Sequence, residues 1–233
     1  MSLGKNTTAA LRNLRKQNRI VNPARGFYVI IPEEMSFAGR IPVERFIDDL
    51  MQFYRVPYYI GLLTAASFYG SAQQSPQVFQ VMTYPSRRSI KFGQNKIVFY
   101  RKKNVGSAPT SRRKTPTGYV RISTVETTFF DLVQFNRSIG GLDYVALLTS
   151  ELTEQITIAG LKKAIPAFQL PIIQRGGYLL EVIGFEKGAI IIENWIRAHS
   201  PIYTYLNPSL IQNREPKHRR WKLIINEKID YSG

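Results

Sequence analysis

The sequence contains no cysteine and only two histidines, His199 and His218. The lack of cysteine excludes a disulfide framework, a cysteine-ligated metal centre and a thiol nucleophile. Neither histidine is flanked by a close carboxylate partner, which disfavours a histidine-based metal site or catalytic triad. We expect neither a metal nor another cofactor. No run reaches the roughly 18 apolar residues that a membrane span needs, and no secretory signal is apparent. We therefore expect a cytoplasmic protein that makes no use of a membrane.

Acidic residues are also scarce. The 233 residues include 32 lysines and arginines but only 16 aspartates and glutamates, which gives a formal net charge of +16. Residues 50–125 contain no acid at all and twelve basic residues. An excess this large is unfavourable for a compact chain unless polyanions offset it, so nucleic acid or an anionic membrane surface is the first partner to consider. Because a nuclease usually needs converging carboxylates for Mg²⁺, the basic window disfavours that class and predicts no catalytic residue.

The first 31 residues predict a basic helix followed by a β-hairpin. Asn6 or Thr7 can cap a helix whose apolar stripe includes Leu11 and Leu14. Two β-branched or aromatic runs then flank a turn that contains Pro23 and Gly26. A helix followed at once by a hairpin is typical of the second half of a winged helix-turn-helix. Two helices normally precede a recognition helix, and only five residues stand before Asn6, so the predicted module, residues 1–38, is partial.

The polar side chains of this module suit DNA. Arginine can pair with guanine and asparagine with adenine in the major groove, and an arginine at the hairpin tip can enter the minor groove. An ordinary solvated helix with a hairpin behind it is the alternative interpretation. The candidate DNA-binding residues are Arg12, Asn13, Arg15, Lys16, Arg19 and Arg25.

Residues 39–233 mix helical and strand patterns, which predicts a larger α/β domain with a mixed sheet; an α+β arrangement is the alternative. Strands are expected near residues 78–83, 96–100, 119–122 and 220–226, and helices near 43–54, 60–69, 125–133, 142–168, 170–183 and 190–198. Glu126 is interpreted as the acid of a capping box that begins one of these helices. Asp131 is interpreted as a structural or surface residue, and the Gly176–Gly177 pair as a point of close packing.

Three groups of basic residues in the window 87–114 form a possible second polyanion-binding surface. If strands 78–83 and 96–100 pair, these groups are expected to gather at one edge of the sheet. Nearby aromatic residues, Tyr58, Tyr59, Tyr84, Phe92 and Tyr100, could stack on unpaired bases, although core packing is the commoner use. The surface would comprise Arg87, Arg88, Lys91, Arg101, Lys102, Lys103, Arg112, Arg113 and Lys114.

Five collinear segments resemble one known family. They are residues 26–30 (GFYVI), 59–70 (YIGLLTAASFYG), 120–132 (VRISTVETTFFDL), 174–184 (QRGGYLLEVIG) and 220–226 (RWKLIIN). In this order they resemble the AbiEi family, antitoxins of type IV, abortive-infection toxin–antitoxin systems that are also described as transcriptional regulators of viral defence. The segment expected to contain Pro-Glu has Val125–Glu126 here.

The resemblance implies a two-part protein. Its N-terminal winged helix would bind inverted repeats in its own promoter and repress the operon. Its C-terminal α/β domain would counteract a nucleotidyltransferase-like toxin without forming a stable complex with it. Two other functions stay open from the residues alone: an RNA-binding or other nucleic-acid-binding module without DNA sequence specificity, and, less favoured, a nuclease.

Overall fold

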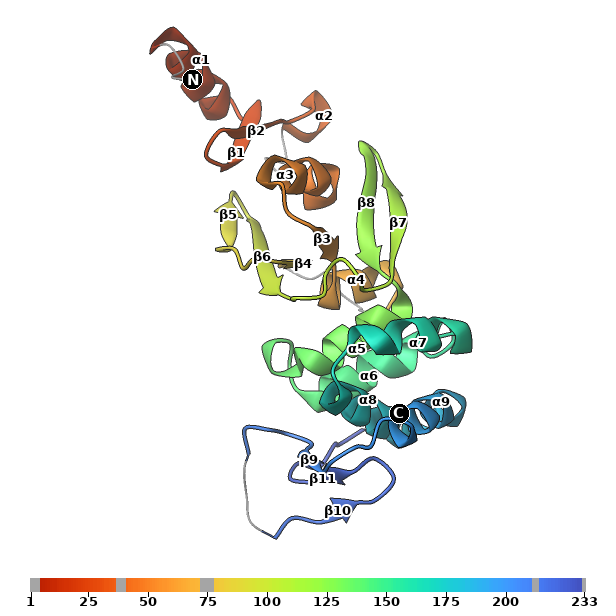
Figure 1. The fold of residues 1–233 in the computed structure, drawn as a ribbon. Coiled ribbons are helices and arrows are strands. Elements are labelled where there is room, and N and C mark those ends of the chain that lie inside the picture. Colours follow the sequence, from red (N-terminus) through yellow and green to blue (C-terminus); the bar gives the residue numbers. More distant parts are fainter. Residues whose placement is uncertain (1–4, 37–40, 72–77, 211–213, 232–233) are drawn as a thin grey trace. The chain divides into compact units, whose positions relative to one another are not determined.

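The computed structural model describes residues 5–36, 41–71, 78–210 and 214–231. The chain forms two compact units (Figure 1). The first contains residues 1–60, 77–105 and 112–121, and the second contains residues 61–76, 106–111 and 122–233. The predicted boundary between residues 38 and 39 lies outside the described residues, and the functional division at that point stays a prediction.

The first unit begins with the predicted helix and hairpin, and both are confirmed. Helix α1 (Lys5–Lys16) precedes the antiparallel strands β1 (Ile20–Ala24) and β2 (Phe27–Ile30). The Asn22 amide donates to the carbonyl oxygens of Ala24 (2.6 Å) and Phe27 (2.8 Å), which stabilises the turn from the inside. Gly26 lies at φ +82°, a backbone conformation that glycine adopts without strain.

The rest of this unit consists of short helices and a six-stranded sheet. The helices are α2 (Glu33–Ser36), η1 (Val43–Arg45) and α3 (Ile47–Tyr54). The strands lie in the order β5-β6-β4-β3-β8-β7. Strand β3 pairs antiparallel with β4, whereas β4 pairs parallel with β6, so the predicted mixed sheet and α/β class are confirmed. The strands are β3 (Tyr58–Ile60), β4 (Phe79–Thr83), β5 (Ile90–Phe92), β6 (Asn95–Arg101), β7 (Thr110–Thr115) and β8 (Gly118–Ser123).

Three of these strands differ from the sequence prediction. Strand β7 lies where no strand was expected, because an edge strand with exposed, cationic side chains has no apolar alternation. Strand β3 lies just before the helix expected near residues 60–69, where no strand was expected, because its three residues are all buried and show no period. Strand β5 is only three residues long and half exposed. Short or uniformly exposed strands do not produce the two-residue period on which the prediction depended.

The second unit is mostly helical. Its helices are α4 (Leu62–Phe68), α5 (Val125–Gln134), η2 (Asn136–Ser138), α6 (Leu142–Leu152), α7 (Ile158–Ala164), η3 (Ile165–Ala167), α8 (Leu170–Val182) and α9 (Glu186–Arg197). A small sheet, in the order β10-β11-β9, joins Lys217–His218, Leu223–Ile224 and Thr204–Tyr205. Only two residues of the closing strand expected at 220–226 are in strand conformation.

Close packing in this unit depends on the glycine pair of α8. A Cβ on Gly177 would lie 2.1 Å from the ring of the fully buried Trp221, and one on Gly176 would lie 2.9 Å from Phe130. The interpretation of the pair as a close-packing point is confirmed. Arg175 beside it is buried and donates its Nε–H to the Tyr205 carbonyl (3.1 Å), and burial lowers the pKa of this guanidinium.

Glu126 has a different role from the one expected. Thr124 is the N-cap of α5, and its side chain accepts from the backbone N–H of Thr127, so Glu126 is not the acid of a capping box for that helix. Its carboxylate is buried and reaches the start of α7 instead. Asp131, on the same helix, is fully buried, which excludes the surface interpretation.

Candidate nucleic-acid interface

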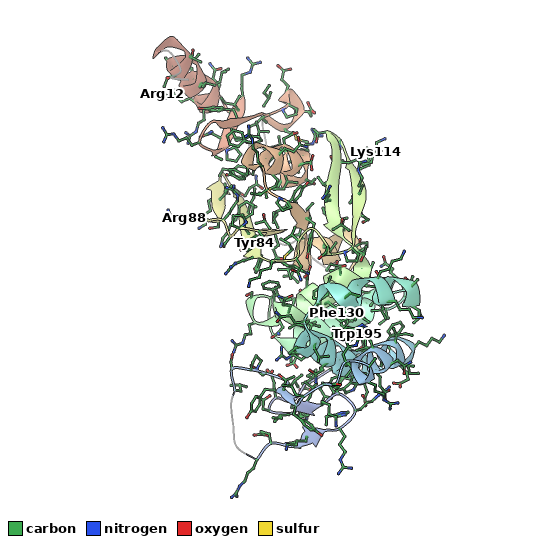
Figure 2. All side chains as sticks on the ribbon, in the orientation of Figure 1. Arg12, Tyr84, Arg88, Lys114, Phe130 and Trp195 are labelled. Carbon is green, nitrogen blue, oxygen red and sulfur yellow. The ribbon has the colours of Figure 1, made fainter. Side chains whose placement is uncertain are left out.

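Helix α1 presents its polar face to solvent. The side chains of Arg12, Asn13, Arg15 and Lys16 are exposed, whereas the apolar Leu11 and Leu14 are half-buried on the side that packs on β1. Figure 2 shows Arg12 pointing away from the helix. The four polar side chains predicted to contact DNA are therefore on one accessible element.

A groove of about 240 Å³ lies between α1 and the hairpin. Arg12 and Arg15 line it from the helix, and Asn22 and Tyr28 line it from the strands. Tyr28 is 39% exposed. The groove thus combines two cations with an accessible tyrosine hydroxyl, a set of donors suited to a phosphate oxygen.

The hairpin supplies the other two predicted residues, and both are exposed. Arg19 stands between α1 and β1, and Arg25 lies at the tip. The tip packs against α3 through an aromatic contact, in which the Phe27 ring centroid lies 5.5 Å from that of Phe53. Arg25 is therefore accessible on a turn whose position is fixed by aromatic packing.

The second basic set does not gather at one edge of the sheet, so that expectation is wrong. Strands β4 and β6 pair as the expectation required. Nevertheless, Lys91 lies on β5 at one edge, whereas Arg112, Arg113 and Lys114 lie on β7 at the other. Figure 2 shows Arg88, in the loop before β5, apart from Lys114 on β7. Spacing along the chain could not reveal the strand order that separates them.

Two members of the set are also engaged inside the unit. Lys102 is only 4% exposed, with its Nζ 5.6 Å from the centre of the Tyr59 ring, so its inclusion in an exposed surface is wrong. The Arg87 guanidinium lies 3.7 Å over the Tyr54 ring and is half-buried. Exposed members are Arg88, Lys91, Arg101, Lys103, Arg112, Arg113 and Lys114.

The aromatic residues named as stacking candidates are mostly buried or half-buried. Tyr58 and Tyr59 are in the core, and Tyr84 is 39% exposed, with the Arg101 guanidinium 5.4 Å from its ring centre. Sequence reasoning missed Tyr119 on β8, which is 50% exposed and lies 4.6 Å from the Arg112 guanidinium. The sequence shows that Tyr119 is near arginines along the chain, but it does not show which residues lie beside Tyr119 in the sheet.

Carboxylates do not converge on this basic unit. Among the described residues, no three histidine, aspartate or glutamate side chains come close enough to hold a metal ion. In the second unit, Glu181, Glu186 and Glu193 surround Arg220, with closest N–O distances of 3.3, 2.6 and 2.8 Å. In the part of the chain that the structure describes, no helix is long and apolar enough to cross a membrane.

The family model of the AbiEi antitoxin C-terminal domain matches residues 59–182. This segment is more than half of the chain. The chain belongs to the AbiEi antitoxin family. It is therefore an antitoxin of a toxin–antitoxin system, and its partner in that system is a toxin. The resemblance noted in the sequence is confirmed, and AbiEi antitoxins are not known as enzymes.

Comparison with solved structures supports the fold of this AbiEi antitoxin. The crystal structure of the RV2827C protein from Mycobacterium tuberculosis superposes with a TM-score of 0.62 at 14% identity, covering 94% of this chain and 80% of that one. The antibiotic-resistance factor ANT(2'')-Ia is 10% identical, with 66% of this chain and 89% of that one covered, and its TM-score of 0.31 is too low to indicate a shared fold. No curated protein matches the chain.

Proposed function

We propose that this antitoxin is also a DNA-binding transcriptional regulator that binds inverted repeats in its own promoter and represses its operon. Residues 1–38 form the DNA-binding module, and residues 39–233 form the antitoxin domain. The observation that carries the proposal is the exposure of Arg12, Asn13 and Arg15 on one face of α1. A helix with this face fits the major groove, where arginine and asparagine read base edges.

The hairpin extends the contact. Arg25 is exposed at its tip, and the adjacent minor groove of DNA attracts arginine because of its negative potential. Arg19 and Lys16 flank the helix end and neutralise backbone phosphates, which fix the register of the protein on the duplex. The net charge of +16 adds long-range attraction to any duplex.

We further propose that the toxin is nucleotidyltransferase-like and is counteracted without a stable complex. The proposal rests on membership of the AbiEi family. Its direct test is co-purification of the two proteins together with a growth assay. Protection from the toxin without a co-purifying complex is the expected result, and a stable stoichiometric complex would contradict it.

The DNA-binding proposal is tested with the triple variant Arg12→Ala/Arg15→Ala/Lys16→Ala. Gel shifts on the upstream region, repeated at several salt concentrations, should show at least a tenfold loss of affinity. The slope of log affinity against log salt should fall by about 1, because Lys16 is the phosphate contact among the three and each such contact contributes roughly one unit. Protection from the toxin should be retained.

A charge-matched control removes three exposed lysines of the second unit, Lys162→Ala/Lys163→Ala/Lys187→Ala. We expect this control to bind the operator within about twofold of the wild type. Equal losses in both triple variants would show that only net charge matters and would reject α1 as the recognition helix. Loss of toxin protection together with operator binding would reject the two-part organisation.

A further inference from the structure

A cavity of about 580 Å³ lies between α3 and strands β7 and β8 of the first unit. Small-molecule sites in proteins typically enclose about 300–1,000 Å³, so this cavity has room for a single nucleotide. Its accessible polar lining comes from Gln52 and Arg55 at the end of α3 and from Arg112, Tyr119 and Arg121 on the two strands. None of these residues belongs to α1 or to the β1–β2 hairpin.

The charge of the lining is strongly positive. Arg55, Arg112 and Arg121 contribute three guanidinium groups, and no described carboxylate forms an ion pair with any of them. Of the described residues around the cavity, only Asp48 carries a negative charge. Three cations against one anion leave a net attraction for a phosphate.

Asp48 is already engaged by neutral donors. Its Oδ1 accepts from the Tyr58 hydroxyl at 2.7 Å, and its Oδ2 accepts from the Gln52 amide at 2.5 Å. Tyr58 is buried, so this pair fixes the carboxylate against the protein. The three guanidinium groups consequently keep their donors for a ligand.

Tyr119 supplies an aromatic surface beside these donors. Its side chain is 50% exposed, and the Arg112 guanidinium lies 4.6 Å from the ring centre. Exposed aromatic rings among cations are the elements with which proteins bind unpaired bases, because every base has a π-face that stacks. The cavity therefore offers a stacking surface and a phosphate subsite within one lining.

The backbone at Arg55 gives an independent indication. Arg55 ends α3 in the left-handed conformation, at φ +55°. Glycine is the usual residue at such a helix end, and a residue with a side chain is disfavoured there. The chain thus carries a guanidinium at a position where backbone preference alone favours glycine.

We propose that this cavity binds one nucleotide, with its phosphate on Arg55 and Arg121 and its base on Tyr119. A free nucleotide and an unpaired nucleotide of single-stranded RNA both provide this chemistry. The site is separate from the duplex-binding surface of α1, and neither proposal depends on the other.

Fluorescence titration of the full-length protein tests the site with two probes, methylanthraniloyl-labelled AMP and fluorescein-labelled penta-adenylate RNA. Tyr119→Ala should weaken binding by about five- to a hundredfold, which is the effect of losing one stacked base. Arg55→Gly should weaken it by about tenfold or more through loss of a charge-assisted hydrogen bond. Inorganic phosphate should compete with the labelled AMP.

Arg55→Gly also separates binding from folding. Because glycine adopts the left-handed conformation without strain, this variant should melt at or above the wild-type temperature. The matched controls are Arg88→Gln, an exposed arginine of the loop before β5, and Tyr144→Ala, an exposed tyrosine of the second unit. Both controls should bind the probes within about twofold of the wild type.

Binding of either probe that depends on Arg55 and Tyr119 supports the proposal. The probe that binds with the higher affinity identifies the source of the nucleotide. Binding of neither probe at millimolar concentration overturns it, as do equal losses in variants and controls. The α1 triple variant should still bind both probes. Arg55→Gly should still bind the operator, so failure of this site is distinguishable from failure of the DNA-binding proposal.

Discussion

Glu126 on α5 caps the start of α7 through Thr157: its Oε1 accepts hydrogen bonds from the Thr157 backbone N–H at 2.9 Å and from the Thr157 hydroxyl at 3.0 Å. The Thr157 hydroxyl oxygen in turn accepts from the backbone N–H of Gly160, at 3.0 Å. A negative charge at a helix N-terminus is also favourable because of the exposed N–H dipoles. One buried carboxylate therefore connects two helices of the antitoxin domain.

This connection predicts a specific coupling between Glu126 and Gly160. A Cβ on Gly160 would lie 2.0 Å from the Glu126 Oε1, so Gly160→Ala should destabilise the wild-type protein. Glu126→Ala should lower the free energy of unfolding by about 1.5–3 kcal/mol, the range for hydrogen bonds to a charged group. In the Glu126→Ala background the space is open, and Gly160→Ala should be neutral or stabilising.

Urea denaturation of the two single variants and the double variant measures this coupling as a double-mutant cycle. Additive losses in the double variant would show that the two residues do not interact and would contradict the packing.

A second prediction concerns Gly177 and Trp221. Gly177→Ala places a methyl group into the fully buried Trp221 ring, and overpacking of this kind costs about 1–3 kcal/mol or more. Gly106→Ala is the matched control, because a Cβ there meets nothing within 4 Å. Thermal unfolding should show a clear loss for Gly177→Ala and a change within about 0.5 kcal/mol for the control. A small effect at Gly177 would mean that α8 shifts to accommodate the methyl group.

The sequence was sufficient to predict elements with strong local signals. The Leu11 and Leu14 spacing predicted α1, and the positions of Pro23 and Gly26 predicted the hairpin turn, because each signal depends on residues a few positions apart. The exposure of the six candidate DNA-binding side chains agrees with these local patterns.

The sheet and its cavity could not be predicted in the same way. Strand β3 is adjacent to β8 in the sheet, although about sixty residues separate them in the chain. The cavity beside α3 brings Arg55 together with Tyr119 and Arg121, a relationship that only this non-local arrangement creates. Likewise, the position of β5 and β7 at opposite edges separates basic residues that looked like one group in the sequence.

The last prediction follows from the buried hydroxyl of Tyr58. Burial, together with its hydrogen bond to Asp48, raises the pKa of Tyr58 above the ordinary value of 10.0. Above pH 10 the unfolded chain therefore loses a proton that the folded protein keeps, so stability falls as the pH rises. The slope is up to about 1.4 kcal/mol per pH unit.

Tyr58→Phe removes this proton from both states and should flatten the decline between pH 10 and 11, although it should also be less stable at pH 7 because Asp48 loses a donor. Urea unfolding at pH 7, 10 and 11 measures both effects. Tyr119→Phe, which removes a hydroxyl from a half-exposed ring, is the matched control and should follow the wild-type profile. If Tyr58→Phe also declined in parallel with the wild type, the alkaline loss of stability would come from other groups, and the Tyr58–Asp48 hydrogen bond would not be its cause.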